Sequence, residues 1–138
     1  MKFCLTLLPI LAFSTVAHAG VFECDMTKKS RYGWISDKIY LEYEENSKGA
    51  RIYDAYTHHY FDKKPLDAEV KRATDKAVVF SWELRNIETD SGKPSGRVKY
   101  TANIERASGR VHVNVLLLSY DNTSFGNGTC KYDAKRRF

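Results

Sequence analysis

Apolar and polar residues alternate along most of this 138-residue chain. In one segment, apolar Phe80, Trp82 and Leu84 alternate with polar Ser81 and Glu83. The same period of two recurs over residues 38–43, 66–71 and 98–105. Because neighbouring side chains of a strand point to opposite faces, this pattern predicts strands with one buried and one solvated face. No segment of ten or more residues has a helical period, so we expect an all-β fold.

Turn-forming residues separate the alternating runs, as in Asp90–Gly96 and Ser108-Gly109. We expect eight strands, at about residues 21–27, 34–44, 50–61, 65–73, 77–87, 97–107, 110–120 and 127–133. Short connections between successive strands favour an antiparallel meander. Eight such strands can close into a single up-and-down barrel, which is the fold we predict. The alternative is a β-sandwich, which usually needs longer crossovers between its two sheets.

The first 19 residues have the pattern of a secretory signal peptide. Met1-Lys2 supplies a positive start, Phe3–Val16 is an uncharged apolar run, and Ala17-His18-Ala19 has small residues where signal peptidase reads them. The apolar run is too short to span a bilayer. We therefore predict a mature protein from near Gly20, periplasmic or secreted, without a transmembrane anchor. The sequons at Asn122 and Asn127 would matter only in a eukaryotic secretory pathway.

Two cysteines remain once the predicted leader, with Cys4, is removed. Cys24 lies in the first predicted strand and Cys130 in the last. An exported protein enters an oxidising compartment, and two cysteines allow only one intramolecular pairing. We therefore predict a Cys24–Cys130 disulfide that closes one barrel domain over residues 20–138, and we expect a monomer.

The charge of the mature chain is mildly basic. The chain has 22 Lys and Arg residues, and loss of Lys2 leaves 21 against 17 Asp and Glu residues, a net charge of +4. Acids and bases are interleaved, which is typical of a soluble mixed surface and does not favour nucleic acid as a partner. The one concentrated positive run is Lys135-Arg136-Arg137, which we expect to be solvated.

Polar and aromatic residues within predicted strands are the candidates for a binding site. Asp54, Tyr56 and His58 share one face of the strand predicted over 50–61, which indicates that this face is wet or that the interior is partly polar. Aromatic residues of other runs could line the same cavity, although aromatic residues more often pack in a core. The candidate ligand-binding residues are Trp34, Asp54, Tyr56, His58, Trp82 and Tyr100.

Catalytic and metal-binding patterns are lacking in the sequence. If His58 and His59 lie in a strand, their imidazoles point to opposite faces and cannot share a metal ion. There is no G-x-S-x-G motif and no phosphate-binding glycine loop, and the predicted disulfide leaves no free thiol. We predict no enzymatic activity, no metal and no cofactor.

The predicted topology resembles that of the calycin group, which includes lipocalins and avidins and commonly binds small apolar molecules. The resemblance is one of topology only, because Gly33 is followed directly by Trp34, without the intervening residue of the lipocalin Gly-x-Trp signature. It implies an exported barrel that binds a small apolar or aromatic ligand.

The alternative function is a protein-interaction module in the cell envelope. In size, leader and disulfide the chain also resembles small exported barrels that inhibit lysozyme or metalloproteases. Such an inhibitor would present a rigid loop to an enzyme cleft, because rigidity limits the entropy lost on binding. The candidate loops are Glu88–Gly96 and Tyr120–Gly128.

Overall fold

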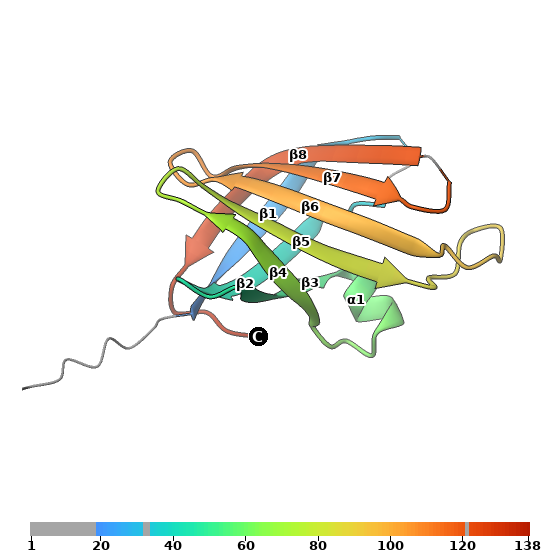
Figure 1. Ribbon diagram of the computed structural model, residues 1–138, viewed down its shortest axis with the longest axis horizontal. Coiled ribbons are helices and arrows are strands. Elements are labelled where there is room, and N and C mark those ends of the chain that lie inside the picture. The colour runs from blue at the N-terminus through green and yellow to red at the C-terminus, as the bar shows by residue number, and fades with distance from the viewer. Residues whose placement is uncertain (1–18, 32–33, 121) are drawn as a thin grey trace, which may run out of the picture.

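The computed structural model describes residues 19–31, 34–120 and 122–138, which form a closed barrel of eight antiparallel strands (Figure 1). The strands are β1 (Ala19–Lys29), β2 (Lys38–Glu44), β3 (Gly49–Asp54), β4 (Leu66–Ala73), β5 (Ala77–Arg85), β6 (Arg97–Glu105), β7 (Arg110–Leu117) and β8 (Asn122–Asp133). Each strand pairs with its neighbour in the sequence, and β8 pairs with β1. The predicted up-and-down barrel is confirmed, and the β-sandwich alternative is wrong.

One helix interrupts the succession of strands, and the described helix is too short and too polar to cross a membrane. This helix, α1 (Ala55–Tyr60), occupies a segment that we predicted as strand. The side chain of Asp54 accepts a hydrogen bond from the Thr57 N–H at 2.9 Å, and the Thr57 hydroxyl oxygen accepts one from the Asp54 N–H at 2.8 Å. This capping box ends β3 and begins the helix, so the local hydrogen bonds outweigh the strand propensity.

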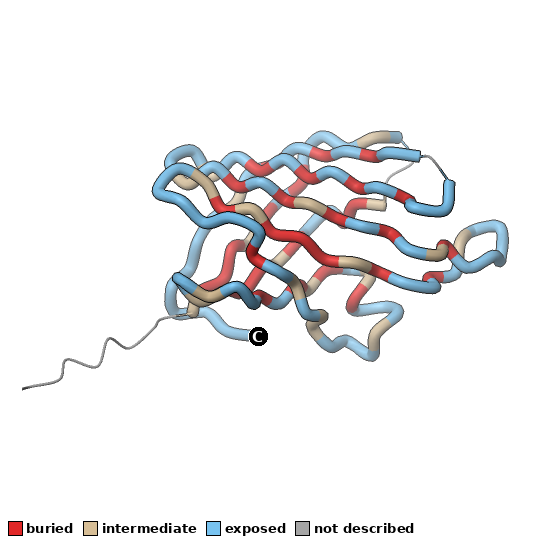
Figure 2. Tube along the Cα trace, in the orientation of Figure 1, coloured by how far each residue is buried: buried red, intermediate tan, exposed pale blue. Residues whose placement is uncertain are grey.

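The alternation in the sequence becomes burial in the structure. Figure 2 shows buried and exposed positions alternating along the strands, and in β7 every second residue, such as Val113, is buried. The rings of Phe22, Tyr43 and Phe80 pack against one another inside the barrel, with centroids 5.4–6.0 Å apart. The interior of an eight-stranded barrel is just wide enough to be filled by such side chains. Each large apolar side chain that is fully buried contributes about 1.5–3 kcal/mol to the free energy of unfolding.

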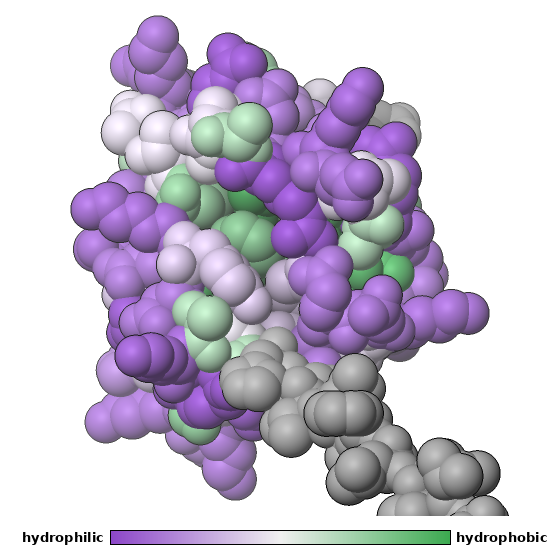
Figure 3. Space-filling view, turned by 90° about the vertical axis from the view of Figure 1, so that its left-hand side faces the viewer, coloured by the Kyte–Doolittle hydropathy of each residue, from purple (hydrophilic) through white to green (hydrophobic). Residues whose placement is uncertain are grey.

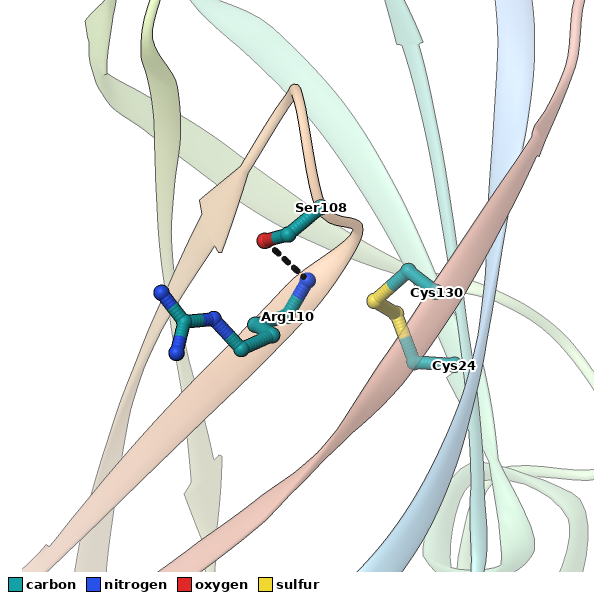
Figure 4. Close-up of a disulfide and its surroundings, with 4 residues drawn as sticks. All are labelled: Cys24, Ser108, Arg110 and Cys130. Atoms are coloured by element: carbon teal, nitrogen blue, oxygen red, sulfur yellow. Dashed lines mark hydrogen bonds between the residues drawn. A yellow bond between two sulfur atoms is a disulfide. The ribbon is translucent and has the colours of Figure 1, made fainter.

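The predicted disulfide is present, and it joins β1 to β8 where the barrel closes. Cys24 and Cys130 lie directly opposite each other in the register of these strands. Figure 4 shows the disulfide beside the turn at Ser108, where the Ser108 hydroxyl accepts a hydrogen bond from the Arg110 N–H at 3.2 Å. The Cys130 N–H donates to the Gly109 carbonyl oxygen at 2.7 Å. The disulfide therefore joins β1 to β8, and a hydrogen bond of Cys130 connects it to the β6–β7 turn as well.

Strand β8 starts earlier than predicted, at Asn122, and therefore contains the glycines at positions 126 and 128. The backbone of β1 approaches this segment closely: a Cβ atom at Gly128 would lie 2.1 Å from the Asp25 carbonyl oxygen. Glycine is therefore required here by close packing of two strands and not by a turn. Other boundaries also differ from the predictions: β2, for example, begins at Lys38, and β7 ends at Leu117.

One end of the barrel is closed by a hydrogen-bonded network between three turns. The Arg106 guanidinium donates to the Tyr43 hydroxyl and to Glu45, both at 2.9 Å, and to the Thr74 carbonyl oxygen at 2.8 Å. Figure 3 looks at this end, where hydrophilic side chains surround a small central area of apolar ones.

The predicted leader, residues 1–19, lies outside the described residues except for Ala19, which begins β1. The leader therefore stays a prediction.

Candidate functional site

The candidate site is a cleft at the barrel end that carries α1 and the loop after β5, on the right in Figure 1. The cleft has a volume of about 530 Å³. Its lining combines aromatic and apolar side chains with a polar rim: Arg31, Trp34, Tyr56, Tyr60, Ile87 and Glu88–Ser91. This volume lies within the usual range of small-molecule pockets, about 300–1,000 Å³.

Three aromatic rings form a stacked row along the cleft. Trp34 and Tyr56 have ring centroids 6.2 Å apart and an interplanar angle of 21°. Tyr56 and Tyr60 continue the row at 6.4 Å and 14°. The two tyrosines are four residues apart on α1, which places them on the same face of the helix. Trp34 and Tyr56 are half-buried and Tyr60 is 42% exposed, so the row offers ring surface to a ligand.

A hydrogen bond from a residue of the barrel core holds the backbone of Trp34 in place. The Tyr100 hydroxyl donates a 2.7 Å hydrogen bond to the backbone carbonyl oxygen of Trp34. The Tyr100 ring stacks on Trp82 with centroids 5.0 Å apart and an interplanar angle of 8°. Burial raises the pKa of Tyr100, and electrostatic interaction with the ionisable groups of Tyr56 and Asp54 raises it further. Tyr100 therefore stays protonated and remains a hydrogen-bond donor.

Asp54 supports the site without lining it. Its carboxylate is 4% exposed and accepts hydrogen bonds from the Ser36 hydroxyl at 3.0 Å and from the Thr57 N–H. Burial raises the pKa of Asp54, and these hydrogen bonds oppose part of that rise. By capping α1, Asp54 sets the position of the helix that carries Tyr56 and Tyr60.

The rim of the cleft is weakly acidic. Glu88 and Asp90 supply two carboxylates and Arg31 supplies one guanidinium, so the formal charge of the lining is −1. Because the formal charge of the lining is negative, the rim favours a neutral or cationic ligand over an anionic one. Burial raises the pKa of Tyr56, and electrostatic interaction with Asp54, Tyr60 and Asp90 adds to the rise.

Five of the six predicted ligand-binding residues gather at this end of the barrel, but only two line the cleft. Trp34 and Tyr56 present ring surface, while Asp54, Trp82 and Tyr100 are buried beneath them. The predicted sharing of one strand face by Asp54, Tyr56 and His58 is wrong, because the strand ends at Asp54.

His58 lies outside the cleft. Its side chain is exposed on α1, and its Nδ1 atom is 2.6 Å from the Tyr53 hydroxyl on the outer face of β3. Within the described residues, no three His, Cys, Asp or Glu side chains are placed to hold a metal ion.

Sequence reasoning missed Tyr60 and assigned the loop residues Glu88–Ser91 to a different role. The spacing of four between Tyr56 and Tyr60 is a helical signal, but it carries meaning only once Asp54 is recognised as a helix cap. The approach of the loop to α1 is a tertiary contact, in which the Tyr60 hydroxyl donates to the Glu88 carbonyl oxygen at 3.4 Å.

Comparisons with known protein families, with curated proteins and with solved structures find no match for this chain. The chemistry that the cleft itself offers is stacking on aromatic faces, together with hydrogen bonding and charge at the rim. Stacking, hydrogen bonding and charge are interactions by which a cleft can bind a small molecule.

Proposed function

We propose that this protein is an exported binding protein that holds a small aromatic ligand in the cleft at the barrel mouth. The observation that carries the proposal is the stacked row of Trp34, Tyr56 and Tyr60 along a cleft of about 530 Å³. A flat ligand extends such a row with ring faces parallel, and aromatic pairs contribute about 0.5–1.5 kcal/mol beyond the area they bury. The ligand lies at the mouth because side chains fill the barrel interior.

The acidic rim narrows the proposal to a neutral or cationic aromatic molecule, such as an aromatic amine. A ligand ammonium group can approach the carboxylates of Glu88 and Asp90 while the ring stacks on the row. A cation close to a ring face is also attracted by the ring itself. The predicted leader and the Cys24–Cys130 disulfide support a place for this function in the periplasm or outside the cell.

Calorimetric titration of the protein with tryptamine tests the proposal. We expect Trp34→Ala to raise the Kd about tenfold, which corresponds to about 1.4 kcal/mol. Phe125→Ala is the matched control, because Phe125 is 53% exposed on β8 and does not line the cleft. Equal affinities of the two variants for tryptamine, or no binding by the parent protein, would contradict the proposal.

A second candidate function is inhibition of a hydrolase by the loop between β5 and β6, and the hydrogen bonding of that loop favours it. The Thr89 N–H donates to the Lys93 carbonyl oxygen at 3.0 Å, and the Ser95 N–H donates to the Ile87 carbonyl oxygen at 2.7 Å. Glu88 and Pro94 form a further β-bridge. The loop is thus an ordered hairpin that projects from the barrel (Figure 1), which would lose little entropy on binding.

The second predicted inhibitory loop, Tyr120–Gly128, is not a loop over its whole length, because residues from Asn122 onward lie in β8. Assays of a lysozyme and of a metalloprotease with excess purified protein test the inhibitor hypothesis. We expect the protein to lower the activity of one of these enzymes. The double variant Asp90→Ala, Ser91→Ala of the protein should no longer have this effect. Full activity of both enzymes would contradict it.

A further inference from the structure

A second pocket lies on the outer face of β2 and β3, on the side wall of the barrel and away from the lining of the mouth cleft. Its volume is about 440 Å³. Tyr40 and Tyr53 are directly paired between the two strands and form its floor. The other lining residues are four cations, Arg51, Lys63, Arg136 and Arg137, together with Pro65 and Phe138. The Phe138 ring lies 6.0 Å from the Tyr53 ring and has the Arg51 guanidinium over it. No carboxylate side chain lines the described pocket.

Two residues of the basic run predicted to be solvated, Arg136 and Arg137, line this pocket, whereas Lys135 does not. The Arg136 guanidinium lies over the Tyr40 ring, 4.8 Å from its centroid, and donates to Glu23 at 2.6 Å. Arg51 is held in a similar way, since it donates to Glu42 at 2.5 Å and at 3.0 Å. Two of the four cations, Arg51 and Arg136, are therefore held in position by ion pairs, and Arg136 also by its contact with the Tyr40 ring.

The other two cations have no acidic partner. Among the ion pairs of the described residues, none involves Lys63 or Arg137. The Arg137 guanidinium donates only to backbone carbonyl oxygens, those of Ala134 and Arg136. Since Glu23 and Glu42 balance two of the four cations, the side chains of the pocket keep a formal charge of about +2 next to half-buried aromatic rings.

We propose that this pocket binds a small anion that carries a flat ring, such as an aryl carboxylate. The anionic group is held by Lys63 and Arg137, where charge-assisted hydrogen bonds replace solvent. The ring packs against the aromatic side of the pocket, where Tyr53 and Phe138 supply the apolar surface that an anion alone does not need. The charge of this pocket is opposite to that of the mouth cleft, so the two sites select different ligands.

Calorimetric titration with 2-naphthoate tests the proposal, with acetate and 2-naphthalenemethanol as probes that lack the ring or the charge. We expect 2-naphthoate to bind at least about tenfold more tightly than either, because both features are recognised together. We expect the double variant Lys63→Gln, Arg137→Gln to weaken 2-naphthoate binding by at least about tenfold. Both side chains are exposed, and thermal melting checks that the variant is folded.

The matched control is the double variant Arg72→Gln, Lys76→Gln, which removes the same charge from exposed positions that do not line the pocket. We expect it to keep the parent affinity for 2-naphthoate. Equal weakening by both double variants would show that net charge alone attracts the anion, and would overturn the proposal. Failure of 2-naphthoate to bind, or binding no tighter than that of 2-naphthalenemethanol, would also overturn it.

Discussion

The hydroxyl of Tyr100, a residue of the barrel core, donates a 2.7 Å hydrogen bond to the backbone carbonyl oxygen of Trp34 at the mouth. This bond joins β6 to the segment before β2 and holds one end of the aromatic row. We predict that Tyr100→Phe lowers the free energy of unfolding by about 1 kcal/mol, the net contribution of a typical hydrogen bond. We also expect the variant to bind tryptamine more weakly. Urea unfolding and calorimetry measure the two effects, and a variant with parent stability and affinity would contradict this role of Tyr100.

The charge of Asp54 predicts a dependence of stability on pH. Because burial raises the pKa of Asp54 above its usual value of 3.8, the folded protein retains this proton to a higher pH than the unfolded chain. The stability that Asp54 contributes is therefore fully present below pH 3.8 and is lost as the pH rises through the folded pKa. Asp54→Asn keeps an acceptor oxygen for the Thr57 N–H without the charge. We predict that this variant gains stability relative to the parent as the pH rises above 3.8 and through the folded pKa, as measured by urea unfolding at a series of pH values.

Asp54→Ala separates the charge of this residue from its capping role. It removes the acceptor for the Thr57 N–H and for the Ser36 hydroxyl. We predict a loss of about 0.5–2 kcal/mol in the free energy of unfolding near neutral pH, the usual cost of losing a helix cap. Parallel urea titrations of the Asn and Ala variants measure both effects. The capping account is wrong if the Asn variant is as unstable as the Ala variant.

The disulfide predicts a large loss of stability without a loss of binding. Cys24 and Cys130 are separated by 106 residues, for which the chain-entropy model gives up to about 4.7 kcal/mol. We predict that the double variant Cys24→Ser, Cys130→Ser melts at a lower temperature while its affinity for tryptamine stays the same, since neither residue lines the cleft. If the double variant had the same melting temperature as the parent protein, the disulfide would not stabilise the closed barrel.

Gly128 tests the close approach of β8 to β1. A Cβ atom there would lie 2.1 Å from the Asp25 carbonyl oxygen, a backbone atom that cannot move without disturbing the strand pairing. We predict that Gly128→Ala lowers the free energy of unfolding by about 1–3 kcal/mol. Gly49→Ala is the control, because its Cβ would come no closer than 3.8 Å to any neighbour. Equal stabilities of the two variants in urea would argue against the close packing.

The barrel was predictable from the sequence because its signals are local and repeat along the chain. The alternation of Phe80, Trp82 and Leu84 with polar neighbours specifies a strand wherever the strand lies. The pairing of Cys24 with Cys130 followed from the predicted export and from the loss of Cys4 with the leader, which leaves only one possible intramolecular pair. Helix α1 was missed because the segment 55–60 is rich in aromatic residues that favour strands, and its cap, Asp54, is indistinguishable by type from a polar strand residue.

The candidate site was only partly predictable because it depends on contacts between distant segments. Trp34 and Tyr56 were identified from their aromatic character, but their stacking arises from the helix that was missed. Trp82 and Tyr100 were predicted to bind the ligand directly, but they are buried and do not line the cleft, and periodicity does not reveal their supporting role. The pocket on β2 and β3 depends on the way in which residues after β8 fold back over Tyr40, which no local pattern encodes.

The most direct test of the account is a ¹⁵N–¹H NMR titration of the protein with tryptamine, observed at the indole N–H signals of its two tryptophan residues. Trp34 lines the mouth cleft, whereas Trp82 is 4% exposed in the core and serves as an internal reference. We predict that the Trp34 signal shifts in a saturable manner while the Trp82 signal stays nearly unchanged. A Trp34 signal that does not move, or two signals that move together, would contradict a binding site at the barrel mouth.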